Sequence, residues 1–184
     1  DTVRRALKAI PGEAGEAWMR GALLDSVKSA LDRPWVLDLD ATIKPLYGHQ
    51  QGAEIGYNPH KPGRPSHVLH TFWVGNLRLV LDAVLTSGKQ HGSGHAKAPL
   101  ERLLDELGES RPSIVRGDCG LGNQDVIEVC EERELAYLLR LRQTANVKRL
   151  IERSFAREDW TRATEMSQGW QAIEDSIKLH GWSR

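Results

Sequence analysis

The sequence predicts an α/β fold in which a mixed β-sheet has helices packed on it. Three observations predict this class. The 184 residues are 40% apolar and 27% charged, a composition that allows a globular domain to bury a sizeable core. Residues 35–88 contain three strand-like runs. From residue 97 onward, helical and strand-like patterns alternate.

The first predicted element is an amphipathic helix over residues 16–32, where apolar side chains recur at helical spacing before Pro34. A strand is expected at residues 35–44, because its apolar run is bounded by a proline at each end. Residues 45–66 contain four of the eight prolines and four glycines, so they predict a long loop. Loops of this length often have a function.

Two strands joined at Gly75 and Asn76 are expected next, as an antiparallel hairpin. Helices and strands then alternate, and the chain continues as a helical or irregular tail. The hairpin strands cover 68–75 and 77–88, the helices 97–108 and 123–134, and the last strands 113–120 and 135–142. This order is that of a ribonuclease-H-like fold, in which the first and fourth strands lie side by side.

The same patterns indicate three parts of the chain. Residues 1–34 form an N-terminal helical segment, and residues 35–144 form a ribonuclease-H-like catalytic core that is incomplete. Residues 145–184 form a tail, interpreted as the start of an insertion or a truncated C-terminal part.

Charge and apolar patterning exclude several classes of protein. Lys plus Arg and Asp plus Glu are both 25, so any contact with nucleic acid has to come from a local cluster of charge. No run of 18 apolar residues and no signal-peptide pattern occurs. These absences predict a cytoplasmic protein that does not bind a membrane. The cysteines, Cys119 and Cys130, do not form a C-x-x-C pair, so no zinc site is expected.

Carboxylates at the ends of two predicted neighbouring strands indicate a metal site. Asp38 and Asp40 alternate with leucines and therefore share one face of their strand. Asp118 lies between Gly117 and Gly120, where the backbone can approach a ligand closely. Carboxylate oxygens suit Mg²⁺ or Mn²⁺. Two such ions about 4 Å apart would activate a water or a sugar hydroxyl for phosphoryl transfer.

A second interpretation of these residues stays open. The segment DLDAT also fits the D-x-D-x-T motif of haloacid-dehalogenase-like phosphatases, in which Asp38 would be the nucleophile and Asp40 the acid/base. The lysine and the hydroxyl residue of such a site would be Lys97 and either Thr71 or Thr86. A proline-rich loop and a hairpin follow the first strand, whereas that family continues with a flap and a helix in a parallel sheet.

The sequence over residues 35–145 resembles the DDE-type transposases of bacterial insertion sequences. The first catalytic Asp of that family stands in a D-x-T setting, which Asp40 and Thr42 match. The second stands in an R-x-D-x-G setting, which RGDCG at residues 116–120 matches. The most specific part is GYNPHKPGRPSH. The resemblance implies that Asp40 and Asp118 bind catalytic Mg²⁺ or Mn²⁺, with Asp38 as the alternative for the first position.

The third acid of that family is a Glu in a Y-x2-R-x3-E-x6-K pattern, which this sequence lacks. Tyr137 and Arg140 have the right spacing, but residue 144 is Thr. We therefore interpret the chain as a fragment of a transposase that catalyses strand cleavage and strand transfer. The fragment is expected to be inactive by itself. A non-catalytic remnant that only binds DNA is a further alternative.

The proline-rich loop carries a local excess of positive charge that predicts DNA contact. Lys44, His60, Lys61 and Arg64 lie in or beside it, against the single acid Glu54. Contacts between such side chains and phosphates dominate binding to DNA. The resemblance implies that DNA, as element ends and target, is the partner. It also implies a homodimer when the protein is full length, located in the bacterial cytoplasm with the nucleoid.

Overall fold

The computed structural model describes residues 1–90, 92–156, 164, 165 and 167–183. By its internal contacts the chain divides into two compact units, residues 1–140 and residues 141–184, and each is described by itself.

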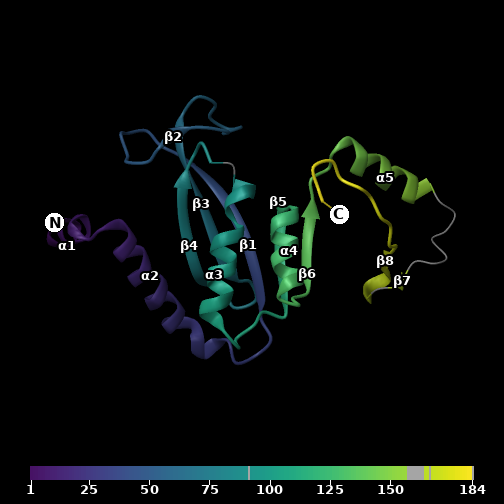
Figure 1. Cartoon of the computed structure of the whole chain (residues 1–184), viewed down its shortest axis with the longest axis horizontal. Coiled ribbons are helices and arrows are strands. Elements are labelled where there is room, and N and C mark those ends of the chain that lie inside the picture. The colour runs from purple at the N-terminus through teal and green to yellow at the C-terminus, as the bar shows by residue number, and fades with distance from the viewer. Residues whose placement is uncertain (91, 157–163, 166, 184) are drawn as a thin grey trace. The chain divides into compact units, whose positions relative to one another are not determined.

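The first unit is built on a mixed sheet (Figure 1). Its strands are β1 (Val36–Pro45), β2 (Glu54–Ile55), β3 (Pro65–Val74), β4 (Leu79–Ser87), β5 (Ile114–Gly122) and β6 (Tyr137–Leu141). Strand β3 pairs antiparallel with β1 along one edge and with β4 along the other, where the short β2 also pairs. Strand β1 pairs in parallel with β5, and β6 borders β5.

This arrangement confirms the predicted fold class. The antiparallel strands β1, β3 and β4 form the expected meander, and the first and fourth long strands, β1 and β5, are neighbours in parallel. The sheet is therefore mixed, and its order is ribonuclease-H-like. The two-residue strand β2, inside the proline-rich loop, was not predicted, because two residues carry no detectable periodicity.

Helices α2 (Gly12–Val27), α3 (Lys97–Leu107) and α4 (Gln124–Glu132) contact the sheet through strands β4 and β5. A 3₁₀ turn, Lys28–Ala30, follows α2, and another, Gly92–His95, precedes α3. Helix α4 begins where the Asn123 side chain accepts a hydrogen bond from the backbone N–H of Val126 at 3.1 Å. Helix α1 (Thr2–Ala9) has no buried residue.

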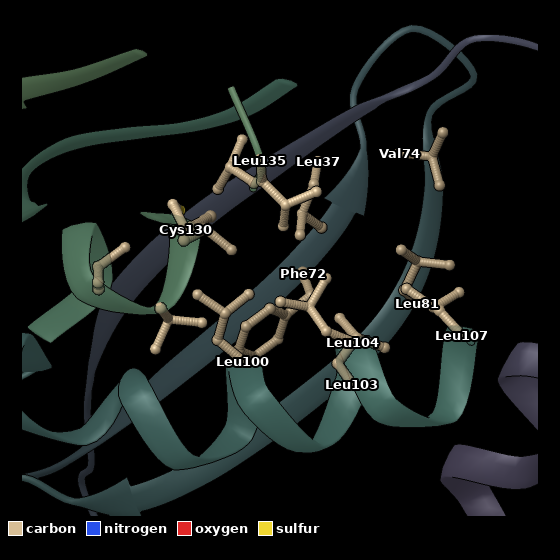
Figure 2. Close-up of a cluster of buried hydrophobic side chains, with 14 of the residues drawn as sticks. Leu37, Phe72, Val74, Leu81, Leu100, Leu103, Leu104, Leu107, Cys130 and Leu135 are labelled. Carbon is tan, nitrogen blue, oxygen red and sulfur yellow. The ribbon is translucent and has the colours of Figure 1, made fainter. Parts of the chain in front are cut away.

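The core lies between these helices and one face of the sheet (Figure 2). Leu100, Leu103, Leu104 and Leu107 recur along α3 at helical spacing and all face the strands. They pack with side chains that alternate along the strands, namely Leu37 and Leu39 of β1, Phe72 and Val74 of β3, Leu81 of β4 and Val115 of β5. A β-bulge between Phe72 and Trp73 lets both Leu81 and Asp82 be buried.

The second unit contains α5 (Ala145–Ala156) and a hairpin of β7 (Thr164–Glu165) and β8 (Gln171–Ala172). Helix α5 begins after Thr144, whose hydroxyl accepts a hydrogen bond from the Val147 N–H at 3.4 Å. The hydroxyl of Ser154 donates to Asp175 at 3.1 Å, which ties the end of the chain to α5. Among the described residues, no helix is long and apolar enough to cross a membrane.

Candidate active site

The candidate site lies on the face of the sheet opposite the core. Leu37 and Leu39 of β1 are buried in the core, so Asp38 and Asp40 point to the other face. On β5, Val115 is buried in the core, and its neighbour Arg116 is exposed. We call the side of the sheet that carries Asp38, Asp40, Arg116 and Asp118 the outward face.

The register of β1 and β5 brings the predicted acids together. The parallel pairing runs from Val36 opposite Ile114 to Leu39 opposite Gly117. Asp40 and Asp118 are the residues that come directly after this pairing, one on each strand, and both are exposed. Neighbouring strands are about 4.8 Å apart, so the two carboxylates lie on adjacent strands and on the same face of the sheet.

Asp38 is occupied by an ion pair with Arg116, its partner in the β1–β5 register. The guanidinium donates from Nε to Oδ1 at 2.6 Å and from Nη2 to Oδ2 at 2.7 Å, which is the strong bidentate geometry. Hydrogen bonding to Asp38, followed by the charge of Asp38, raises the pKa of Arg116 above its usual value. The guanidinium therefore stays charged.

Asp40 and Asp118 each accept a hydrogen bond from an uncharged donor. The Thr42 hydroxyl donates to Asp40 Oδ2 at 3.2 Å, and the Gly120 N–H donates to Asp118 Oδ1 at 2.9 Å. Within the described residues, neither carboxylate forms an ion pair with a Lys, Arg or His. Their remaining lone pairs are thus available to a cation.

An open groove of about 420 Å³ adjoins Asp118. It is lined by Asp38, Arg116 and Asp118, together with Leu138 and Arg140 of β6. The groove thus combines the Asp118 carboxylate, the Asp38–Arg116 ion pair and Arg140, so it carries groups that suit a metal ion and a group that suits a phosphate.

The donor chemistry fits a hard divalent cation but does not complete its coordination. Oxygen ligands from two Asp side chains suit Mg²⁺ or Mn²⁺. Across the described part of the chain, no three His, Cys, Asp or Glu side chains are placed to hold a metal ion together. Asp40 and Asp118 would therefore supply only part of a ligand set.

The four predicted DNA-binding residues are all exposed. Lys44 lies on the outward face of β1, four residues beyond Asp40, and a strand rises about 3.3 Å per residue. His60 and Lys61 lie in a turn where both backbone N–H groups donate to the Asn58 side chain. Arg64 lies farther along the same loop. The structure thus places one of the four on the same strand face as Asp40, farther along β1, and three in the loop.

The proline-rich loop has a defined conformation. The Arg64 guanidinium lies 4.6 Å from the centre of the Tyr47 ring, a cation–π contact. A Cβ atom on Gly56 would lie 1.8 Å from the carbonyl oxygen of Gly88, so these two backbone segments touch. Glu54, the single acid of the loop, is hydrogen-bonded by the Ser87 hydroxyl. The loop is therefore anchored at the end of β4.

Sequence reasoning missed the ion pair of Asp38 with Arg116, although a signal was present. Each residue precedes a predicted metal ligand by two positions, on strands expected to be neighbours. It also missed the hydrogen bond that the Gly75 N–H donates to the Val36 carbonyl at 2.9 Å. No local pattern marks that contact, because it depends on the hairpin returning to β1.

A family model described as Transposase DDE domain group 1 matches residues 2–184. Among solved structures, the chain is similar to Mos1 transposase in a paired-end complex with the left transposon end, at 14% identity over 76% of this chain and 53% of that chain, with a TM-score of 0.39. No curated protein matches the sequence.

Two further solved structures are similar. One is piggyBac transposase in a synaptic complex with hairpin DNA, at 13% identity, 68% of this chain, 27% of that chain and a TM-score of 0.43. The other is the HTLV-2 integrase catalytic core domain with magnesium in its trimeric form, at 15% identity, 67% of this chain, 66% of that chain and a TM-score of 0.39. The chain thus spans less than two thirds of these solved chains. Because the family model matches nearly the whole sequence, the protein belongs to the group 1 family of transposase DDE domains.

Proposed function

We propose that residues 35–144 are the incomplete catalytic core of a DNA transposase that cleaves and joins strands at the ends of an insertion sequence. The observation that carries this proposal is the position of Asp40 and Asp118. Each is the first residue after the printed β1–β5 pairing, on neighbouring strands and one exposed face, and neither is neutralised by a Lys or Arg among the described residues. Two carboxylates that repel each other and have no cation are a natural metal-binding pair.

In this proposal Asp40 and Asp118 hold Mg²⁺ or Mn²⁺, and Asp38 does not. Both oxygens of Asp38 accept from Arg116, so its lone pairs are less available. When bound, the metal would act as a Lewis acid and would activate a water or a sugar hydroxyl toward a phosphodiester. The protein's part is to fix two oxygen ligands on rigid neighbouring strands, which sets where the phosphate must lie.

The metal site of this proposal needs a third acid. The expected Tyr–Arg–Glu pattern breaks at Thr144, and two carboxylates alone leave most of the octahedral positions of Mg²⁺ to water. We therefore propose that the 184-residue chain binds metal weakly and does not cleave DNA by itself. In the full-length transposase we expect a homodimer that acts on DNA at the bacterial nucleoid.

The loop provides the proposed path of the DNA backbone beyond the metal. Lys44, His60, Lys61 and Arg64 extend positive charge from β1 into the loop. Contact of Arg64 with the Tyr47 ring limits the freedom of its guanidinium, which lowers the entropy lost on binding a phosphate. These contacts would hold DNA regardless of sequence.

The phosphatase interpretation has no support. A haloacid-dehalogenase-like nucleophile would be Asp38, but a carboxylate that accepts two bonds from Arg116 is a poor nucleophile. That family also uses a parallel sheet, whereas β1 pairs antiparallel with β3. The remaining alternative is a remnant that binds DNA without cutting it.

The experiment is a strand-cleavage assay with a full-length transposase that contains this chain, on DNA carrying the element ends. Asp40→Asn and Asp118→Asn are each expected to lower cleavage at least about a hundredfold, because each removes an anionic metal ligand. Binding of the same DNA should change little. Asp32→Asn, an exposed residue before β1, is the control. Normal cleavage by either variant would contradict the assignment of that residue.

The loop is tested by DNA affinity as a function of salt. The double variant Lys61→Ala/Arg64→Ala removes two phosphate contacts, so the slope of log affinity against log salt should fall by about two. Affinity should weaken for all DNA sequences alike. Substituting Lys28 and Arg33, which are exposed and outside the loop, is the matched control. An unchanged slope would show that the loop does not contact phosphates.

A further inference from the structure

The ion pair of Asp38 and Arg116 lies on the outward face, next to the proposed metal ligands along both strands. Asp38 is two residues before Asp40 on β1, and Arg116 is two residues before Asp118 on β5. An ion pair thus stands next to a pair of like charges. This arrangement matters because an Arg near two carboxylates competes with a cation for them.

Asp38 and Arg116 neutralise each other's charge. Two of the five N–H groups of Arg116 go to the two oxygens of Asp38, at 2.6 and 2.7 Å. A guanidinium without Asp38 would be able to turn toward Asp40 or Asp118. A carboxylate without Arg116 would be a third anionic oxygen ligand beside the other two.

Gly75 leaves the space in which this pair forms. A Cβ atom at residue 75 would lie 2.0 Å from Asp38 Oδ2 and 3.1 Å from Arg116 Nη2. The φ angle of Gly75 lies outside the left-handed region, so glycine is not needed there for backbone conformation. The turn after β3 therefore closes directly over the ion pair, and a side chain would push Asp38 away from Arg116.

We propose that Asp38 and Arg116 are positioning residues that sequester each other and thereby leave Asp40 and Asp118 free for the metal ion. Asp38 keeps the guanidinium off the metal-binding carboxylates, and Arg116 keeps Asp38 from becoming a competing ligand. The inference rests on the proposed function, because it takes Asp40 and Asp118 to be the ligands. It goes beyond that function by giving a role to two residues that do not themselves bind the metal.

The test is a Mn²⁺ titration of the 184-residue chain, followed by loss of the EPR signal of free Mn²⁺. Asp38→Asn releases the guanidinium and should weaken Mn²⁺ binding about tenfold, whereas Arg116→Gln adds a free carboxylate and should tighten it about tenfold. The double variant Asp38→Asn/Arg116→Gln has neither free charge. Its Mn²⁺ affinity should return to within about threefold of the unaltered chain.

A simple brace between β1 and β5 makes a different prediction. All three variants break such a brace, so the double variant would bind Mn²⁺ no better than the weaker single variant, and that result would overturn the inference. Thermal unfolding of every variant checks that the sheet is intact. Because the pair is partly exposed, the unfolding temperatures should stay close together.

Asp40→Asn in the same titration separates the two proposals. If Asp40→Asn binds Mn²⁺ as well as the unaltered chain, the metal site itself is wrong, and the sequestering role falls with it. If Asp40→Asn loses Mn²⁺ but the double variant does not recover, the metal site stands and the sequestering role alone is overturned.

Discussion

The two faces of the sheet in residues 1–140 come from the same strands, but the acidic side chain of the ion pair is buried on one face and partly exposed on the other. On the core face, the Asp82 side chain is 2% exposed and accepts a bond from Arg102 at 2.9 Å. On the outward face, the Asp38 side chain is 30% exposed and its partner Arg116 is 47% exposed. A buried ion pair is costly to break, because the remaining group keeps a charge away from water. A hydrated pair contributes little to stability.

The same contrast occurs within one strand. Leu37 and Leu39 of β1 fill the core, while Asp38 and Asp40, between and beside them, face outward. The period of two in a strand allows one segment to supply both stability and chemistry. Substitutions on the two faces should therefore have separate effects, those on the core face on stability and those on the outward face on function.

The largest effect is expected at Leu37, which is completely buried. Leu37→Ala should lower the free energy of unfolding by about 4 kcal/mol, because it removes apolar contacts and leaves a cavity. Asp40→Asn, on the other face of the same strand, should change it by less than about 0.5 kcal/mol. Urea denaturation followed by circular dichroism measures both. Equal losses would contradict the division of the two faces.

A smaller difference in the free energy of unfolding is expected between the two ion pairs, Asp82 with Arg102 and Asp38 with Arg116. Asp82→Asn should lower the free energy of unfolding by about 2 kcal/mol, because it replaces a charged hydrogen bond with a neutral one in the core. Arg102 is 36% exposed and can reach water, which keeps this loss below that of a fully buried pair. Asp38→Asn should cost at most about 1 kcal/mol. A larger loss for Asp38→Asn, in the same urea experiment, would reverse the comparison.

The smallest effect is a pH dependence from the core face. His70 is buried, and that burial, followed by the charge of His95, lowers the pKa of His70 below its usual 6.5. The unfolded chain therefore binds a proton first as pH falls. The contribution of neutral His70 to the free energy of unfolding is therefore fully present above pH 6.5, and it is lost as the pH falls through and below that value. His70→Gln should flatten this part of the stability profile, and an unchanged profile would contradict the effect.

The fold could be predicted largely from local patterns. Periodicity identified the helix containing Leu100 and the strand containing Leu37, because both put apolar residues on one face. The order of elements then implied that β1 and β5 are neighbours, and with it that Asp40 and Asp118 are near each other. Helix α2 ends at Val27, earlier than the predicted limit at residue 32, because a 3₁₀ turn continues the chain.

The pairing of Asp38, and not Asp40, with Arg116 could not be predicted, because the two acids face the same way and differ only in what lies opposite. That difference comes from the register with β5, which places Arg116 beside Asp38. Register depends on long-range pairing and not on the residues next to each Asp. The same limit applies to Gly75 and to the contact of Arg64 with Tyr47, which exist only after distant segments meet.

Crystallography of the chain with Mn²⁺, in which the anomalous scattering of the ion locates it, tests directly which carboxylates bind the metal. We expect a peak in contact with one carboxylate oxygen of Asp40 and one of Asp118, while Asp38 remains paired with Arg116. The peak should be absent in crystals of Asp40→Asn. A peak on Asp38, or one away from all three carboxylates, would contradict the claim that Asp40 and Asp118 are the metal ligands.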